Sequence, residues 1–573
     1  MGKKMMLLGL AIAVTLRYLW KTPHQDSVSL EDIDIPEVLQ ASLRDYGPPE
    51  VIKVSDNVFV AVGYSFATVT LIVGSDGVIV VDTSDNMETA TRILNEFHRL
   101  TDKPTKLIIY THHHPDHVYG AKAFITPGAP APEIWAHQRV TKEEILAQTV
   151  TEMYMKRAGY QFGVFLDDKY RLKILHGSGS LKDAFRGKSG KLPPTKLVKG
   201  DFNATVADIH FRILHIPGET SDHIGVWLPE SGILIAADNF CKSFPNLYAI
   251  RGTAPRDVTD WIRSLDKMIE LRPRWLISGH YKPIEGEEEV RAILTDYRCA
   301  IQYVHDQTVR HINKGTHPDE IAKTVRLHDD FKDNPYLWQV YGTVPWSAKG
   351  IYDMYMGWFS GYAVDLNPLT PAERARKMVE LVGEDRLLST AESALKSHEY
   401  QWALELASHV FVADASNGRA VSMRRAALKK ITGRMTSGNG RHFLMSTILD
   451  DSGLLPKLQA KQLYANMPAP AILARIRYRV NAETVPIGED IRGCFNFTDT
   501  SSTICLRLYR SVIIQLPSEV EEWNFKVYLK ETTFIDLLNN FYNRRVFDTI
   551  HQDILIKGDS SKLQKFFSYI DVD

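Results

Sequence analysis

The stretch TKLIIYTHHHPDHVYG, Thr105–Gly120, decides the fold and the chemistry that this chain can support. Its first part, Leu107–Tyr110, is a short apolar run, which predicts a buried strand. Four histidines and an aspartate follow directly where that strand ends. Ligand sites in α/β folds favour the carboxyl ends of strands, so the cluster stands where a functional site is expected.

The spacing within the cluster divides it into two pairs. Alternate side chains of an extended segment share a face, so His112 and His114 point the same way while His113 points away. Asp116 and His117 begin the helix expected after the strand. Their side chains should turn back towards His112 and His114. A lone histidine would be an ordinary core or surface residue, but imidazole and carboxylate groups at this spacing predict one pair on each of two metal ions.

Two ligands for each ion are too few for tight tetrahedral binding. Three later polar residues also follow apolar strands: Glu219 in PGET, Asp238 in AADN and His280 in SGH. Any one of them alone would be interpreted as a turn-capping residue. Together with the histidine cluster they complete a set of seven candidate metal ligands.

The pattern around these motifs predicts the architecture. Strands and helices alternate over residues 50–165 and again over 195–285, which predicts two sheets packed face to face with helices outside. From residue 287 to about 449 nearly every segment has helical periodicity. One of these helices should begin at Thr370-Pro371 and end at Gly383. The last segment, about 458–573, alternates strands with a few helices.

Size, charge and cysteine content narrow the class of protein. A chain of 573 residues is too long for one core. Its net charge of −1 gives no reason to expect a nucleic-acid partner. No cysteines form a C-x-x-C pair, which argues against a cysteine-based zinc site. Cys494 and Cys505 could bridge a hairpin in an oxidising compartment, or remain two buried thiols.

The N-terminus predicts a location. Residues 1–22 begin with Lys3 and Lys4, which precede a run of apolar or small residues over 5–16, and this pattern predicts a signal peptide or an uncleaved membrane anchor. We therefore expect a secretory route, with the protein secreted or membrane-anchored on the lumenal or exterior side. Glycosylation triplets at Asn203 and Asn496 agree with that route.

The order HHHPDH, PGET, AADN and SGH resembles the metallo-β-lactamase superfamily. PGET together with NLYAIRG resembles the alkylsulfatases, zinc enzymes that hydrolyse long-chain alkyl sulfate esters. ALKSHEYQWALELASHVFVAD resembles their helical dimerisation domain, and DILIKGDSSKLQKFFSYID resembles their sterol-carrier-like domain. The resemblance spans about residues 45–573. It implies an αββα metallo-β-lactamase sandwich over 45–286, an all-α helical dimerisation domain over 287–450 and an α+β sterol-carrier-like domain over 458–573.

The resemblance also implies a site, a cofactor and partners. It assigns ligands to two zinc ions per chain: His112, His114 and Glu219 to the first, Asp116, His117 and His280 to the second, and Asp238 as the bridge. Asn246 and Arg251 match the sulfate-binding pair of the family. The bridging carboxylate of the family is usually glutamate, one methylene longer than Asp238. The implied partners are a small sulfate ester with an apolar chain and a second copy of the chain.

The expected reaction is hydrolysis of a sulfate ester by a metal-bound hydroxide, because zinc lowers the pKa of its bound water towards neutrality. Asp238 and Arg251 are the expected catalytic residues, and Arg251 offers a planar donor that binds two oxygens of a sulfate or phosphate. Asp82 is expected to orient a ligand histidine. His223 is expected to be structural, with proton donation as the alternative.

Two other functions stay open. A relative that cuts a thioester, a lactone or a phosphodiester would use the same metal site, and the sulfate donors would also bind a phosphate. A lipid-binding scaffold with a vestigial metal site is the second alternative, against which the seven ligand positions argue. The aromatic stretches YLWQVYGTVPW and IYDMYMGWF could line a path for an alkyl chain, form a dimer interface or pack in a core.

Overall fold

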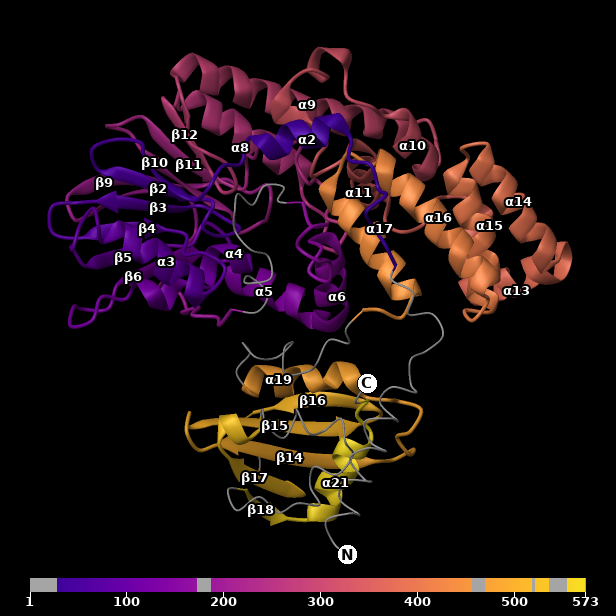
Figure 1. The fold of residues 1–573 in the computed structure, drawn as a ribbon. Helices are drawn as coiled ribbons and strands as arrows, with labels where there is room; N and C mark the ends of the chain where they lie inside the picture. The colour runs from indigo at the N-terminus through magenta and orange to yellow at the C-terminus, as the bar shows by residue number, and fades with distance from the viewer. Residues whose placement is uncertain (1–27, 173–186, 456–468, 518–520, 535–553, 572–573) are drawn as a thin grey trace, which may run out of the picture. The chain divides into compact units, whose positions relative to one another are not determined.

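The computed structural model describes residues 28–172, 187–455, 469–517, 521–534 and 554–571 (Figure 1). The chain divides into two compact units, Met1–Pro456 and Lys457–Asp573, and each is described by itself. The segment interpreted as a signal or anchor, residues 1–22, lies outside the described residues. None of the helices within the described ranges combines the length and the apolar character that crossing a membrane requires.

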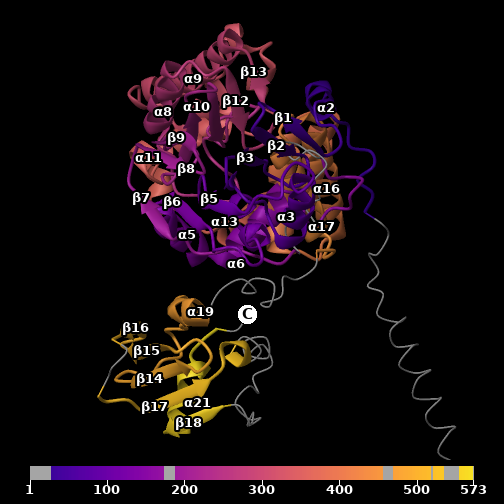
Figure 2. The same cartoon turned by 90° about the vertical axis from the view of Figure 1, so that its left-hand side faces the viewer.

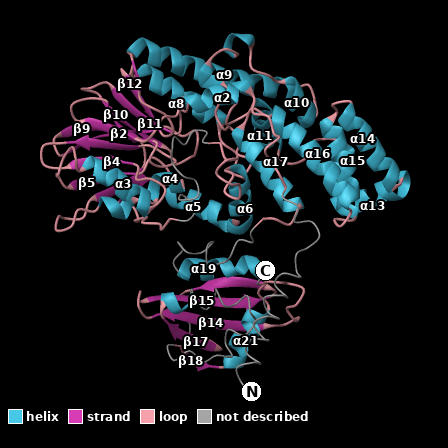
Figure 3. Cartoon of the chain, in the orientation of Figure 1, coloured by secondary structure: helices cyan, strands magenta, loops and turns pink. Residues whose placement is uncertain are grey.

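Two β-sheets pack together on one side of the first unit, and the helical region lies beside them (Figure 3). The first sheet runs in chain order, antiparallel from β1 to β4 and parallel from β4 to β7. In the second sheet, ordered β13-β12-β11-β10-β9-β8, only β11 and β12 pair in parallel. The strands of the first sheet are β1 (Glu50–Lys53), β2 (Val58–Val62), β3 (Val69–Val73), β4 (Val78–Val81), β5 (Thr105–Ile109), β6 (Glu133–His137) and β7 (Lys196–Val198). Those of the second are β8 (Phe202–Val206), β9 (Ile209–His215), β10 (Ile224–Leu228), β11 (Ile233–Ala237), β12 (Trp275–Ser278) and β13 (Ile284–Glu285).

The two sheets share one apolar interior, because each contributes a row of buried β-branched side chains. The outer face of the first sheet packs against α3 (Met87–Phe97), whose N-cap is the side chain of Asn86. The outer face of the second sheet packs against α8 (Val258–Glu270) and α9 (Glu287–Ile312) (Figure 2). The result is the helix–sheet–sheet–helix arrangement that the alternating pattern predicts.

Helices alone make up the rest of the first unit after β13. The predicted boundaries of α13 are confirmed: Thr370 forms a capping box with Glu373, Pro371 is the first helical residue and Gly383 ends the helix. This helical region and the sandwich belong to one compact unit, and α17 packs against α6 (Thr151–Gln161) of the sandwich. The helices are α10 (Pro318–Thr324), α11 (Val344–Met356), α12 (Ala363–Leu366), α13 (Pro371–Val382), α14 (Glu384–Lys396), α15 (Tyr400–Ala413), α16 (Gly418–Arg434) and α17 (Gly438–Asp451).

The second unit is a five-stranded sheet of order β16-β15-β14-β17-β18 with helices packed on it. Its core is rich in buried phenylalanines. Cys494 and Cys505 face each other on β14 and β15 and form a disulfide, which decides between the two alternatives that the sequence left open. The elements are α19 (Ala469–Arg475), β14 (Asp490–Phe497), β15 (Ser502–Tyr509), β16 (Val512–Leu516), β17 (Phe525–Leu529), β18 (Leu555–Gly558) and α21 (Ser560–Ser568).

Candidate metal centre

The seven candidate ligands lie together at one edge of the sandwich, because each follows the end of a strand. β5 leads into His112 and His114, and the short helix α4 (Pro115–Val118) carries Asp116 and His117. Three further ligands come from the second sheet: Glu219 after β9, Asp238 after β11 and His280 after β12. Their donor atoms form three groups within 4.8 Å: His112 with His117 and Asp238, Asp116 with His117 and His280, and His114 with Glu219 and Asp238.

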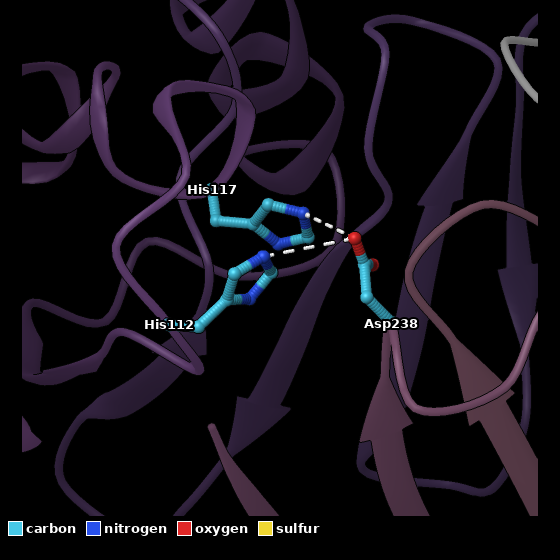
Figure 4. Close-up of side chains that lie close together, drawn as sticks. All are labelled: His112, His117 and Asp238. Carbon is cyan, nitrogen blue, oxygen red and sulfur yellow. Dashed lines mark ion pairs between the residues drawn. The ribbon is translucent and has the colours of Figure 1, made fainter. Parts of the chain in front are cut away.

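Asp238 holds the centre of this cluster. One oxygen, Oδ2, lies 3.6 Å from His112 Nε2, 3.4 Å from His117 Nε2 and 3.1 Å from His280 Nε2. Figure 4 shows the His112 and His117 rings converging on this oxygen from the side of the first sheet. Asp238 thereby links donors that arise from both sheets.

The backbone around Asp238 is shaped for this position. Ala237 has a φ of 43°, a conformation that residues other than glycine adopt rarely and that is found at functional sites. A Cβ on Gly279 would lie 2.0 Å from Asp238 Oδ1, so any side chain there would displace the carboxylate. The space for Asp238 therefore depends on glycine at position 279.

Three histidines present Nε2 to the cluster because Nδ1 is engaged elsewhere. His117 donates from Nδ1 to Asp82 Oδ2 at 2.7 Å, so the predicted contact of Asp82 with a histidine is present. His280 donates from Nδ1 to the carbonyl of Phe66 at 2.9 Å. His112 Nδ1 lies 3.1 Å from Thr111 Oγ1, whose own proton goes to Asp82. Histidines that bind metals are held in this way, with the second ring nitrogen on an acceptor.

The charges of the cluster fit divalent cations. Burial alone would raise the pKa of Asp238, but His280 and His117 outweigh it and hold that pKa well below its usual value. Burial alone would lower the pKa of His280, but the Asp238 carboxylate outweighs it and raises that pKa to about 9. Within the described residues, His117 Nε2 and Asp238 Oδ1 are buried without a hydrogen-bond partner. Buried carboxylates require positive charge nearby, and these two atoms are available as metal ligands. Both features suit a site for metal ions.

Glu219 has a cationic partner that sequence reasoning missed. Nη2 of Arg256 lies 2.7 Å and 2.6 Å from the two carboxylate oxygens of Glu219. Burial raises the pKa of Glu219 to about 7, and the Arg256 guanidinium opposes that shift. The sequence signal for Arg256 is indirect: a buried glutamate requires a cationic partner, and that partner can come from any part of the chain.

Arg251 lies beside the cluster and Asn246 is set back from it. Nη2 of Arg251 is 3.4 Å from His114 Nε2, and Nε donates to the hydroxyl of Tyr154 at 2.9 Å. Both Arg251 and His114 line a cavity of about 800 Å³, together with Glu219 and Arg256. Among the described residues Asn246 is not part of that lining; it is buried, and its carbonyl accepts a hydrogen bond from Arg256.

The two remaining histidines of interest occupy distinct places. His113 turns from the ligand cluster towards Asp222, with Nδ1 at 3.0 Å from its carboxylate, and also lines the cavity. His223 accepts a hydrogen bond at Nε2 from the backbone N–H of Asp238 at 3.2 Å. Burial lowers the pKa of His223 to about 4. A neutral imidazole that supports the backbone of Asp238 agrees with the structural role expected for His223.

Comparison with known proteins gives matches to both parts of the first unit. The family model for the metallo-beta-lactamase superfamily matches residues 62–280. The family model for alkyl sulfatase dimerisation matches residues 317–450. The sandwich and the helical region therefore each resemble a known family, in the order that the sequence motifs predict.

Curated relatives match nearly the whole chain. A linear primary-alkylsulfatase of Pseudomonas sp. is 30% identical over 524 residues, which are 87% of this chain and 98% of the relative. An alkyl/aryl-sulfatase of Saccharomyces cerevisiae is 26% identical over 544 residues, 91% of this chain and 82% of the relative. Among solved structures, the stereoselective inverting sec-alkylsulfatase Pisa1 of Pseudomonas sp. superposes with a TM-score of 0.79 at 23% identity, covering 95% of this chain and 88% of that one. This last likeness shows the shared fold.

Proposed function

This chain belongs to the alkylsulfatases of the metallo-β-lactamase superfamily and is a sulfuric ester hydrolase, and from that premise we propose that it holds two zinc ions and cleaves sulfate esters of alkyl or similarly hydrophobic alcohols. The observation that carries the proposal is the position of Asp238, which belongs to two of the three donor groups. A carboxylate that belongs to two donor groups is in a position to serve both metal ions of a two-ion site.

The donor types favour zinc. Imidazole and carboxylate ligands are typical of zinc enzymes, and a catalytic zinc keeps a position open for water or substrate. We assign His112, His114 and Glu219 to one ion, and Asp116, His117 and His280 to the other, with Asp238 between them. This assignment follows the resemblance and agrees with two of the donor groups, Asp116 with His117 and His280, and His114 with Glu219 and Asp238.

Zinc ions held by these residues would supply Lewis acidity and would lower the pKa of bound water, so that hydroxide would be available at neutral pH. The side chains and backbone of the protein orient the ligands and bind the anion. Asp82 and the Phe66 carbonyl keep the His117 and His280 rings in the tautomer with Nε2 free. Arg251 binds the sulfate oxygens and offsets their charge. The resemblance assigns Asn246 to the same anion, but among the described residues Asn246 does not line the cavity, and we propose that it supports the site through the contact of its carbonyl with Arg256.

The residues that line the cavity suit a ligand with an anionic head and an apolar tail. His114, Glu219 and Arg251 stand at the charged part of its lining. Val150 and Met153 are large apolar side chains that line the same cavity and are exposed. We therefore place the sulfate beside Arg251 and the alkyl chain along Val150 and Met153, where its burial against apolar surface favours binding.

The active form is proposed to be a homodimer joined through the helical region. Nearly all apolar side chains of residues 355–369 are exposed, including Trp358 at 75% and Leu366 at 62% of their surface. A run of exposed apolar residues of this kind marks an interaction surface. It lies within the residues that match the alkyl sulfatase dimerisation family, which makes a second copy of this chain the partner that the similarity favours.

We also propose a secretory location. The N-terminal pattern of lysines and apolar residues supports it, and so does the disulfide between Cys494 and Cys505. Disulfides persist in oxidising compartments and are rare in the cytosol. Release of the mature protein, or its retention by residues 1–22, can be followed by N-terminal sequencing of the protein recovered from medium and membranes.

The proposed function is tested by measuring the turnover of several substrates with protein of a single, fixed zinc content. Zinc-loaded protein is offered dodecyl sulfate, shorter alkyl sulfates, dodecyl phosphate, a phosphodiester, a thioester and a lactone. Release of inorganic sulfate with rates that rise with chain length supports the proposal. Faster turnover of the phosphate, the thioester or the lactone would assign the site to one of the alternative reactions.

A further inference from the structure

We propose that Tyr154 is an additional anion-binding residue, whose hydroxyl donates to a sulfate oxygen while it accepts from Arg251. This proposal rests on the proposed function, because it takes the sulfate group as the occupant of the cavity beside Arg251. It also gives α6 a role: this helix positions the anion-binding arginine and supplies a second donor beside it.

One face of α6 holds the segment that carries Arg251. Tyr154, Arg157 and Gln161 are spaced three and four residues apart, so they lie on the same side of the helix. Arg157 donates to the carbonyl of Ile250 at 2.5 Å, and Gln161 accepts from the backbone N–H of Arg251 at 2.9 Å. Three side chains of one helix thus contact two consecutive residues, which fixes the backbone on which the guanidinium stands.

The hydrogen bond between Tyr154 and Arg251 leaves a proton available. A guanidinium only donates, so the Tyr154 hydroxyl must be the acceptor of the bond from Arg251 Nε at 2.9 Å. A phenol has one O–H to donate in addition. Within the described residues that O–H has no acceptor, and Tyr154 lines the same cavity as Arg251, His114 and Glu219. The group therefore presents a donor to whatever anion sits against the guanidinium.

Contacts on several sides fix Tyr154 and the helix α6 that carries it. Its ring and the ring of Phe162 both lie 5.8 Å from the Arg251 guanidinium carbon, so aromatic faces flank the cation. On the far side of α6, Lys156 pairs with Asp450 of α17 at 3.2 Å, and Tyr160 donates to the same carboxylate. His442 of α17 donates to the carbonyl of Gln161 at 3.3 Å. A donor that is preorganised in this way loses little entropy when it binds an anion.

The test compares Tyr154→Phe with Tyr160→Phe in the zinc-loaded full chain. Both changes remove one phenolic hydroxyl from α6 and keep the ring, but only Tyr154 lines the cavity. The probe is inorganic sulfate, whose affinity is measured by calorimetry and as an inhibition constant, alongside KM and kcat for dodecyl sulfate. Zinc content of each variant is measured in the same samples.

We expect Tyr154→Phe to weaken sulfate binding and to raise KM by about tenfold or more, the effect of losing one hydrogen bond to a charged group, with zinc content unchanged. Tyr160→Phe should leave sulfate affinity within about twofold, because Lys156 still pairs with Asp450. Sulfate affinity of Tyr154→Phe within twofold of the unchanged protein would overturn the proposal.

A double-mutant cycle separates direct contact from positioning. If Tyr154 donates to the anion, Tyr154→Phe should weaken sulfate binding again when it is added to Arg251→Lys. If Tyr154 acts only through Arg251, the added change should have no effect, and the proposed contact would be wrong. Because sulfate binding needs no turnover, these results are independent of the substrate panel: failure to release sulfate from any ester would contradict the proposed function and leave the binding comparison interpretable.

Discussion

Arg256 meets Glu219 in a buried pair in which one guanidinium nitrogen lies within 2.7 Å of both carboxylate oxygens. A second nitrogen of Arg256 donates to the carbonyl of Asn246. One arginine therefore ties a proposed metal ligand to the segment that carries Arg251, the proposed sulfate-binding residue. A glutamate carboxylate has two oxygens, and in a buried site the oxygen that does not bind a metal requires a hydrogen-bond donor. Arg256 supplies that donor to Glu219.

Replacing Arg256 with glutamine should weaken the binding of one metal ion. The change removes the charge that orients the Glu219 carboxylate, and changes of this kind beside a metal ligand cost about tenfold to hundredfold in metal affinity. Zinc content after dialysis against graded chelator measures the effect. Arg263→Gln is the control, since Arg263 forms an exposed pair with Asp260 on α8. Equal zinc retention by both variants would contradict the role given to Arg256.

Arg251→Ala should raise KM for alkyl sulfates by about tenfold or more while zinc content stays the same, because charge-assisted hydrogen bonds to the sulfate are lost. Steady-state kinetics with dodecyl sulfate and metal analysis of the same sample give both quantities. An unchanged KM would remove Arg251 from the anion site, and loss of zinc would show that its contact with His114 is structural.

The buried side chain of His442 should make the folding stability of the first unit fall at acidic pH. The ring accepts from the Leu172 N–H at 3.0 Å and donates to the Gln161 carbonyl, and burial lowers its pKa to about 3. Between about pH 6.5, the ordinary value, and pH 3 the unfolded chain binds a proton that the folded chain does not. Stability is therefore full above pH 6.5 and falls as the pH drops, by up to about 1.4 kcal/mol per pH unit.

The measurement is the free energy of unfolding of the first unit from pH 7.5 to pH 4.5 for the unchanged protein, His442→Gln and the control His210→Gln. His210 is exposed and belongs to β9. We expect His442→Gln to be less stable at pH 7.5 and to lose less stability on acidification. Parallel pH curves for all three proteins would refute the contribution of His442.

Changing Trp358 and Leu366 together to serine should convert the proposed dimer into a monomer. Both side chains are exposed apolar residues of the segment 355–369, and their removal takes away the apolar surface that drives association. Sedimentation equilibrium of both proteins measures the shift. Ile487→Ser, an exposed apolar residue of the second unit, is the control. A double variant that stays dimeric would place the interface elsewhere in the helical region.

Much of the fold and the ligand cluster could be predicted because the signals are local. The run before His112 predicts a strand by its own composition, and Thr370-Pro371 specifies the start of a helix within a few residues. Glu219, Asp238 and His280 could be grouped with the histidine cluster because each follows an apolar strand, and strand ends meet at one edge of a sheet.

The sequence predicts that Asp82 orients a ligand histidine, but two other supporting residues, Arg256 and Tyr154, could not be predicted, because their partners are distant in the chain. Arg256 acts on a ligand 37 positions away, and Tyr154 accepts from Arg251 across 97 positions. Neither stands in a recognisable motif. The contact of Arg256 depends on how the segment after β11 packs against the turn after β9, and the contact of Tyr154 depends on how α6 packs beside that segment. The sandwich and the helical region also form one compact unit, in which α6 packs against α17. The periodicity of the sequence does not predict this tertiary contact.

The most direct test of the metal centre is zinc analysis of the purified, folded full chain, run beside sulfate release from dodecyl sulfate for the unchanged protein and for Asp238→Asn. We predict two zinc ions per chain with release of inorganic sulfate, and loss of both zinc and turnover when Asp238 no longer carries its charge. A folded protein that holds no transition metal and cannot be reconstituted, or an Asp238→Asn variant with full zinc and full activity, would contradict the account.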